Sequence, residues 1–200
     1  MQKLLLVCCL LLYINTDVFA QYRLPENFMF VNDAEGNPLK VEKDFNQDGR
    51  NDLFAIIGKE ENIKVFALLS KGKSEYRTLT HDDLDYFDCC AAIFVSRNVI
   101  TLSTNGMRFF EHYKFRYNKK LNNFELIGYD SESLGNAMND GSGTRSLNLI
   151  TGLYLYSIHH VSEDGKDHVE EGRRKIKLPK KYTLTCFHDL LPFIEKLTGS

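Results

Sequence analysis

Apolar residues along this chain occur mainly in short runs that alternate with polar turns. The runs Leu53–Ile57 and Ile63–Leu69 have the length and β-branched content of buried strands. Lys71-Gly72-Lys73 then predicts a turn, and Tyr76–Leu79 predicts a returning strand. The first half of the chain therefore indicates antiparallel strands joined by short connections.

Hairpin signals continue in the second half. Asn105-Gly106 separates the β-rich runs Val99–Thr104 and Met107–Tyr117, and both residues of such a pair accept positive φ. A second hairpin is expected within Ser146–Ile158, around Thr151-Gly152. Strands follow one another without the alternation with helices that a parallel sheet requires.

Helical spacing of apolar residues is found at the C-terminal end. Phe187–Leu197 places Leu190, Leu191, Ile194 and Leu197 on one helical face, and Gly199 is a natural stop. We therefore predict an all-β protein, an antiparallel meander or sandwich or a partial propeller-like sheet, with a short C-terminal helix.

Oxygen-bearing side chains recur at alternate positions just before the first predicted strand. Asp44-Phe45-Asn46-Gln47-Asp48-Gly49-Arg50-Asn51-Asp52 ends directly before the apolar run at Leu53. Calcium takes six to eight oxygen ligands in a flexible shell, which this spacing suits. The predicted metal ligands are the side chains of four residues and one backbone carbonyl, that of Arg50: Asp44, Asn46, Asp48, Arg50 and Asp52.

The loop differs from an EF-hand because the twelfth position is Ala55 instead of Glu and because a strand follows it. The Asp-x-Asn-x-Asp-Gly-x-x-Asp pattern resembles the calcium loops of FG-GAP and VCBS repeats, in which the loop leads directly into an apolar strand. The match covers about one repeat, whereas a propeller needs several. An acidic surface turn without metal is the alternative interpretation.

The N-terminus has the composition of a secretory signal peptide. Lys3 precedes the uncharged apolar stretch Leu4–Ile14, and Val18-Phe19-Ala20 suits signal peptidase. We expect cleavage after Ala20, which leaves residues 21–200, about 180 residues, as a single β-rich domain. The predicted location is secreted or periplasmic, with no membrane span, and weak calcium sites are common in extracellular modules.

The charge of the chain narrows the kinds of ligand that it can bind. The formal net charge of −2 disfavours nucleic-acid binding. The basic run Arg173–Lys181 is interpreted as a strand with one solvated face, or as a polyanion site.

After signal removal three cysteines remain, Cys89, Cys90 and Cys186. A vicinal disulfide, a bridge to Cys186 and buried thiols all remain open.

A second resemblance concerns the central part of the chain. The order of four segments resembles an uncharacterised family of secreted bacterial β proteins, from the acidic loop to about Thr151. The segments are Cys89-Cys90, Tyr113–Tyr117, Leu126–Ser131 and Leu147–Gly152. This resemblance implies a compartment and a fold, but no activity. Because it includes Cys89-Cys90 and not Cys186, it favours a vicinal bridge or buried thiols over the long bridge.

Catalytic signatures are absent from the sequence: it has no Gly-x-Ser-x-Gly, His-Glu-x-x-His, Walker or Rossmann pattern. Gly141–Thr144 is interpreted as a polar turn. Two functions are carried forward. The first is a calcium-stabilised β module that binds a protein or glycan. The alternative is a secreted hydrolase with an active site assembled from loops, for which we assign no catalytic residue. Convergent carboxylates in a deep pocket or a Cys-His contact would favour the hydrolase, and a flat aromatic face would favour the binder.

Overall fold

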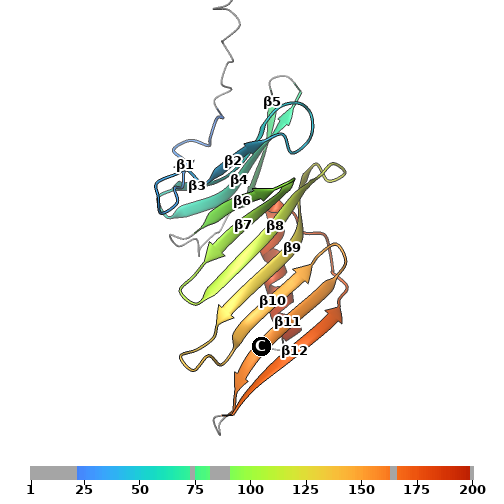
Figure 1. Cartoon of the computed structure of the whole chain (residues 1–200). Coiled ribbons are helices and arrows are strands. Elements are labelled where there is room, and N and C mark those ends of the chain that lie inside the picture. The colour runs from blue at the N-terminus through green and yellow to red at the C-terminus, as the bar shows by residue number, and fades with distance from the viewer. Residues whose placement is uncertain (1–21, 73–74, 82–90, 163–165, 199–200) are drawn as a thin grey trace, which may run out of the picture.

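Two antiparallel sheets form the protein (Figure 1). The computed structural model describes residues 22–72, 75–81, 91–162 and 166–198. The predicted all-β class, with a short C-terminal helix, is confirmed. The predicted signal peptide, Cys89 and Cys90 lie outside the described residues. Within these residues no helix is long and apolar enough to cross a membrane.

The smaller sheet contains the first five strands. Its path runs β1-β3-β4-β5, and β2 pairs with the first half of β3, Asp52–Ala55. Strands β3 and β4 are almost wholly buried because both of their faces are covered by apolar residues. The strands are β1 (Met29–Phe30), β2 (Lys40–Lys43), β3 (Asp52–Lys59), β4 (Asn62–Lys71) and β5 (Glu75–His81).

The larger sheet is a seven-stranded meander. Each strand pairs with its neighbours in sequence, in the order β12-β11-β10-β9-β8-β7-β6. Its strands are β6 (Ala92–Ser96), β7 (Val99–Asn105), β8 (Phe109–Asn118), β9 (Asn123–Leu134), β10 (Ser142–Asn148), β11 (Leu153–Val161) and β12 (Asp167–Lys175). The meander alternative of the predicted fold is therefore the one observed for this sheet.

Two short helical segments follow the last strand. The 3₁₀ segment η1 (Leu184–Leu190) leads directly into α2 (Leu191–Thr198). In Figure 1 the helical end of the chain lies behind the seven-stranded sheet. The predicted C-terminal helix is thus present, although its first part is a 3₁₀ helix with a kink at Cys186.

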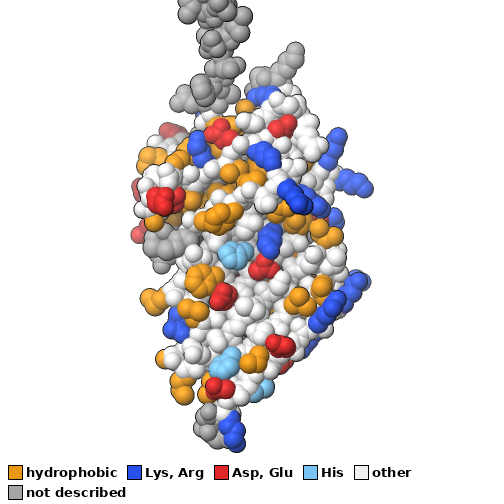
Figure 2. Space-filling view, in the orientation of Figure 1, with side chains coloured by type: hydrophobic (Ala, Val, Ile, Leu, Met, Phe, Trp, Pro, Cys, Tyr) orange, Lys and Arg blue, Asp and Glu red, His pale blue; other side chains and the backbone are white. Residues whose placement is uncertain are grey.

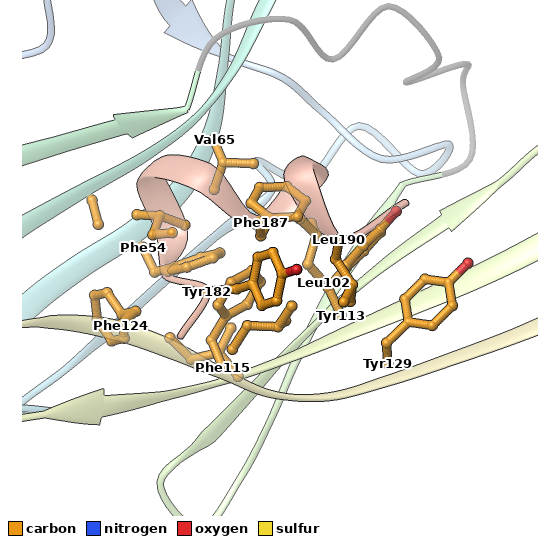
Figure 3. Packing of buried hydrophobic residues seen from close by; sticks show 14 of the residues in the cluster. Phe54, Val65, Leu102, Tyr113, Phe115, Phe124, Tyr129, Tyr182, Phe187 and Leu190 are labelled. Atoms are coloured by element: carbon orange, nitrogen blue, oxygen red, sulfur yellow. The ribbon is translucent and has the colours of Figure 1, made fainter. Parts of the chain in front are cut away.

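The main core lies between the sheets and the helical segment. One face of β3 and β4 contributes Phe54 and Val65, and the inner face of the larger sheet contributes Tyr113 and Phe115. Figure 3 shows Phe187 of η1 among these rings. Its ring centroid lies 4.9 Å from that of Tyr113 and 5.3 Å from that of Phe115. The helical segment therefore closes the core that the two sheets leave open.

The hairpin at Asn105-Gly106 forms, but its turn differs from the one expected. Neither residue has a positive φ, and the Gly106 amide donates to the Phe109 carbonyl at 2.8 Å. A Cβ on Gly106 would overlap the Phe109 ring. Glycine is needed here because an aromatic ring packs on its backbone, so the expected two-residue turn with positive φ was wrong.

Two further predictions need correction. Ser142–Thr144, expected in a polar turn, begin strand β10, where Gly143 pairs with Ile158. The basic run continues the strand only to Lys175, and β12 is exposed on both faces instead of one. Both errors arise because strand pairing stabilised segments whose own residues favour turns or solvent.

Candidate functional site

The acidic loop connects β2 to β3; the strand after the loop was predicted from the sequence, whereas β2 was not. Asp44 follows directly after β2, and Asp52 is the first residue of β3. Gln47 and Gly49 have positive φ values of 62° and 89°. Glycine adopts this conformation at little cost, which explains its place in the tight turn. The five predicted ligands therefore lie along this loop and the first residue of β3, but Asp44, Asp48 and Asp52 do not form a group that could hold a metal.

Asp52 lies at the buried base of this loop. One carboxylate oxygen accepts the backbone amides of Phe45 at 2.8 Å and Asn46 at 3.0 Å. The other accepts the Ser70 amide at 2.7 Å, the Ser70 hydroxyl at 2.8 Å and the Asn46 side-chain amide at 3.3 Å. Burial raises the pKa of Asp52, and these hydrogen bonds offset part of the rise.

The other side chains of the loop fold back on its own backbone. Asp44 accepts the amides of Asp48 at 3.1 Å and Gly49 at 2.9 Å, and Asn46 Oδ1 accepts the Asp48 amide at 2.9 Å. Asp48 accepts the Arg50 amide at 3.0 Å, and it shares the single proton of the Ser70 hydroxyl, 2.8 Å away, with Asp52. Burial opposes ionisation of Asp48, but its hydrogen bonds outweigh this effect and lower its pKa.

Arg50 ties the loop to the next hairpin through its side chain. Its guanidinium donates to the Gly72 carbonyl and, at 2.8 Å, to the Tyr76 hydroxyl. The same group lies 4.8 Å from the centroid of the Tyr76 ring, in cation–π contact. The sequence suggested Arg50 only as a carbonyl ligand, and gave no signal for Ser70 or Tyr76 as partners of the loop.

The oxygen ligands of the loop suit a hard cation. The residues differ, however, in how many lone pairs their hydrogen bonds leave free to bind one. An ionised carboxylate offers about four lone-pair sites. Asp44 and Asp48 keep part of theirs after the bonds described above, whereas three backbone amides and the side chains of Ser70 and Asn46 leave no free site on Asp52. In the described parts of the chain no three His, Cys, Asp or Glu residues are grouped to hold a metal. Calcium binding therefore stays a prediction, with Asp44, Asn46 and Asp48 as the available side chains.

The outer face of the seven-stranded sheet is the second candidate site. Because Ile100, Leu102, Tyr113 and Phe115 face the core, the alternate residues face outward. Figure 2 shows this face open to solvent, with charged, apolar and histidine side chains interspersed. Phe94 in β6 is 59% exposed. Such a wide, uncovered face suits a macromolecular ligand better than a small substrate.

Lys114 and Asp130 form an ion pair at the centre of this face. The second Asp130 oxygen accepts the Ser146 hydroxyl at 2.6 Å. The Lys114 stem lies across Gly128, where any Cβ would be in tight contact with it. Both oxygens of the Asp130 carboxylate are therefore engaged by neighbouring side chains.

A shallow groove of about 560 Å³ crosses the outer face above β10, β11 and β12. Leu155 is its apolar element, and Glu171 and Arg173 lie on its β12 side. The remaining side chains that face outward here carry hydroxyl groups: Thr144, Ser146 and Ser157. The groove thus offers many hydrogen-bonding groups and a single carboxylate, and it lacks the carboxylate pair that most glycosidases need.

Glu111 forms a polar cluster on the inner face that the sequence did not reveal. Its carboxylate accepts the hydroxyl groups of Tyr113 at 3.0 Å and Tyr129 at 2.6 Å. Burial, and then the charge of Glu111, raises the pKa of both phenols. Both phenols therefore stay protonated and serve as buried hydrogen-bond donors.

The adjacent histidines point to opposite faces of β11, as expected from strand geometry. His159 Nε2 lies 3.6 Å from an Asp167 oxygen, and the His160 ring stacks on His168 with centroids 5.0 Å apart. Cys186 carries a free thiol, 3.6 Å from the Thr183 hydroxyl. None of these contacts is a Cys-His pair.

Comparison of the chain with known protein families, with characterised proteins and with solved structures finds no match.

Proposed function

We propose that this protein is a secreted or periplasmic, calcium-stabilised β module that binds a glycan on the outer face of its seven-stranded sheet. The observation that carries the proposal is the open groove above β10–β12, with Leu155 among side chains that bear hydroxyl groups. Serine is depleted in protein–protein interfaces, which makes a protein the less suitable ligand for this surface. Hydroxyl groups and the separate charges of Glu171 and Arg173 complement the hydroxyl groups of a sugar.

Calcium has a structural role in this proposal. It binds Asp44, Asn46, Asp48 and the Arg50 carbonyl, and its charge offsets the repulsion between the carboxylates of the loop. The loop is anchored on β4 through Ser70 and on Tyr76 through Arg50. Stabilising the loop therefore stabilises the edge of the smaller sheet, at a distance from the glycan groove.

Secretion is supported by the signal-like N-terminus. An intact mass of the exported protein that corresponds to a chain starting at Gln21 supports it. A mature form that retains Lys3 contradicts it.

A panel of defined immobilised oligosaccharides tests the binding function with the mature chain. The Ser157→Trp variant fills the groove and should lose binding while keeping its thermal midpoint, because Ser157 faces outward. Thr101→Trp is the matched control, since it lies on the same face but on β7, four strands away, and should bind normally. The absence of any bound glycan, or equal binding by Ser157→Trp, contradicts the proposal. Cleavage of a bound glycan would instead restore the hydrolase alternative.

A further inference from the structure

Strand β12 forms one edge of the seven-stranded sheet. It pairs with β11 alone, from Leu153 opposite Lys175 to Val161 opposite Asp167. Every residue of β12 is exposed except Gly172, which has no side chain and is partly covered. In Figure 1 this strand is the rim of the sheet, with no described element beyond it. Nine residues of extended backbone are thus available for a further strand.

The backbone groups that are free along this edge can be assigned from the ladder. The Ile176 amide donates to the Gly152 carbonyl at 2.8 Å, and at the other end the Ser162 amide donates to the Lys166 carbonyl at 2.9 Å. Even-numbered residues of β12 therefore bond to β11. In an antiparallel ladder the alternate residues then direct their N–H and C=O groups outward. These residues are Val169, Glu171 and Arg173, together with Asp167 and Lys175 at the ends.

Charges along β12 are distributed in two halves around Gly172. The half before it carries Asp167, Glu170 and Glu171, and the half after it carries Arg173, Arg174 and Lys175. Glu171 and Arg173 have no ion-pair partner among the described residues. Lysine is the charged residue that edge strands use most to discourage pairing. This strand instead carries charges of both signs, and it is complementary to its own reverse.

We propose that two copies of this chain pair through β12, antiparallel, with a two-fold axis at Gly172, so that the two seven-stranded sheets become one continuous sheet. In this register Glu171 lies opposite Arg173 of the second copy, and Glu170 lies opposite Arg174. Each contact occurs twice by symmetry, as in any isologous interface. Opposite charges that face one another across strands stabilise the pairing.

The same register satisfies the free backbone groups. Glu171 and Arg173 both direct their N–H and C=O groups outward, so they form a hydrogen-bonded pair across the interface. The Gly172 residues of the two copies meet as a non-hydrogen-bonded pair, because Gly172 bonds to β11. Side chains also match by face, since Glu171 and Arg173 both border the outer groove.

Neighbouring registers are disfavoured by charge. Shifting the axis to Glu171 places the two Glu171 carboxylates opposite each other. Shifting it to Arg173 places the two Arg173 guanidinium groups opposite each other. Like charges directly across two strands destabilise the pair. Only the register centred on Gly172 pairs every acidic residue next to the axis with a basic one.

Gly172 also suits the axis sterically. The Tyr156 ring lies over its backbone on the inner face, where a Cβ would overlap the ring. Tyr156 is held there by its hydroxyl, which donates to Glu170 at 2.8 Å and accepts from Arg174 at 2.9 Å. The ring therefore protects the backbone at the point where the two strands approach most closely, and it orients both charged side chains of the inner face.

Sedimentation of the full mature chain, with charge-reversal variants, tests the proposal. The wild-type mass should double as concentration rises. Glu171→Arg and Arg173→Glu should each weaken association by roughly tenfold or more, because attractive contacts become repulsive. Lys120→Glu reverses a charge at an exposed turn away from β12 and should leave association unchanged. A wild-type chain that remains monomeric overturns the proposal, as does a single reversal that dimerises normally.

Mixing the two variants separates electrostatic pairing from a folding defect. Glu171→Arg carries two positive charges beside the axis and Arg173→Glu two negative ones, so together they should form a heterodimer as tight as the wild type. Failure of the mixture to associate overturns the charge-pairing model.

Cross-linking then tests the register. Hydrogen-bonded partners have Cα atoms about 5.5 Å apart, within disulfide range. A mixture of Val169→Cys and Lys175→Cys should give a disulfide between positions 169 and 175, identified by peptide mapping. A predominant link between two copies of position 169 contradicts the register. The sedimentation experiments contain no glycan. A failure to dimerise can therefore be told apart from a failure to bind glycan.

Discussion

The Asp52 carboxylate and the Ser70 backbone amide lie 2.7 Å apart, and this bond joins the start of β3 to the end of β4. The Ser70 hydroxyl donates to the same oxygen at 2.8 Å. Asp52 thereby connects the acidic loop to the buried strand pair of the smaller sheet. Its main role in the structure is to accept hydrogen bonds from groups that water cannot reach.

Removal of this carboxylate should destabilise the protein strongly. Asp52→Ala leaves the buried amides of Phe45 and Ser70 without acceptors, together with the Asn46 amide. An unsatisfied buried group costs about 1–3 kcal/mol, so we expect a loss of roughly 3 kcal/mol or more in the free energy of unfolding. Urea unfolding in the presence of a chelator measures it.

Asp44→Ala is the matched control for that measurement. Asp44 accepts amides of exposed residues, Asp48 and Gly49, which water can solvate after the substitution. Its cost should stay below about 1 kcal/mol. Equal losses for the two variants would contradict the distinct role of Asp52.

Calcium should raise the thermal midpoint of the mature chain. An ion that binds only the folded state stabilises it by about 2.7 kcal/mol at a hundredfold excess over its Kd. Asp48→Ala should abolish the shift, whereas Asp33→Ala, in the separate turn after β1 in which Asp33 accepts the Asn37 amide at 2.8 Å, should retain it. Calorimetry with calcium and with chelator provides the comparison, and an unchanged wild-type midpoint in millimolar calcium excludes the site.

Two glycine substitutions should differ in cost. Gly72 and Gly152 both have positive φ, 65° and 71°. A Cβ on Gly72 meets open space, whereas one on Gly152 overlaps the Ile176 carbonyl oxygen. Gly72→Ala should therefore cost about 1 kcal/mol for the backbone conformation alone. Gly152→Ala should cost clearly more, and chemical denaturation that gives equal values would show that the overlap is relieved cheaply.

Cys186 should remain a thiol in the mature protein. The structure shows it free and half-buried, at the kink of η1. Alkylation under denaturing, non-reducing conditions, followed by peptide mapping, should therefore label Cys186 fully. A peptide that links Cys186 to Cys89 or Cys90 would contradict this expectation and would restore the long bridge.

Local patterns predicted the elements better than their partners. The strands that follow the acidic loop are where the apolar runs placed them, because burial on both faces requires continuous apolar residues. Strand β6 was missed because its pattern is short and includes the exposed Phe94. The loop was predicted from the spacing of its oxygen-bearing side chains. Ser70, which hydrogen-bonds to Asp52, lies almost two strands further along the chain. That contact depends on the pairing of β3 with β4, which no local pattern encodes.

The charge complementarity of β12 was also beyond local reasoning. The basic residues after Gly172 attracted attention, whereas the acidic residues before it did not, because only the strand order shows that both halves lie on one free edge.

The meander arrangement also affects how the protein folds. Every pairing in the seven-stranded sheet joins strands that are consecutive in the chain. Contacts that are local in sequence close small loops, and proteins rich in them fold faster than those that pair distant segments. The sheet can therefore assemble one hairpin at a time from β6 to β12, before η1 packs against it. A hairpin added or lost at the β12 end would leave the pairings already formed unchanged, so this sheet can vary in length without a change of topology.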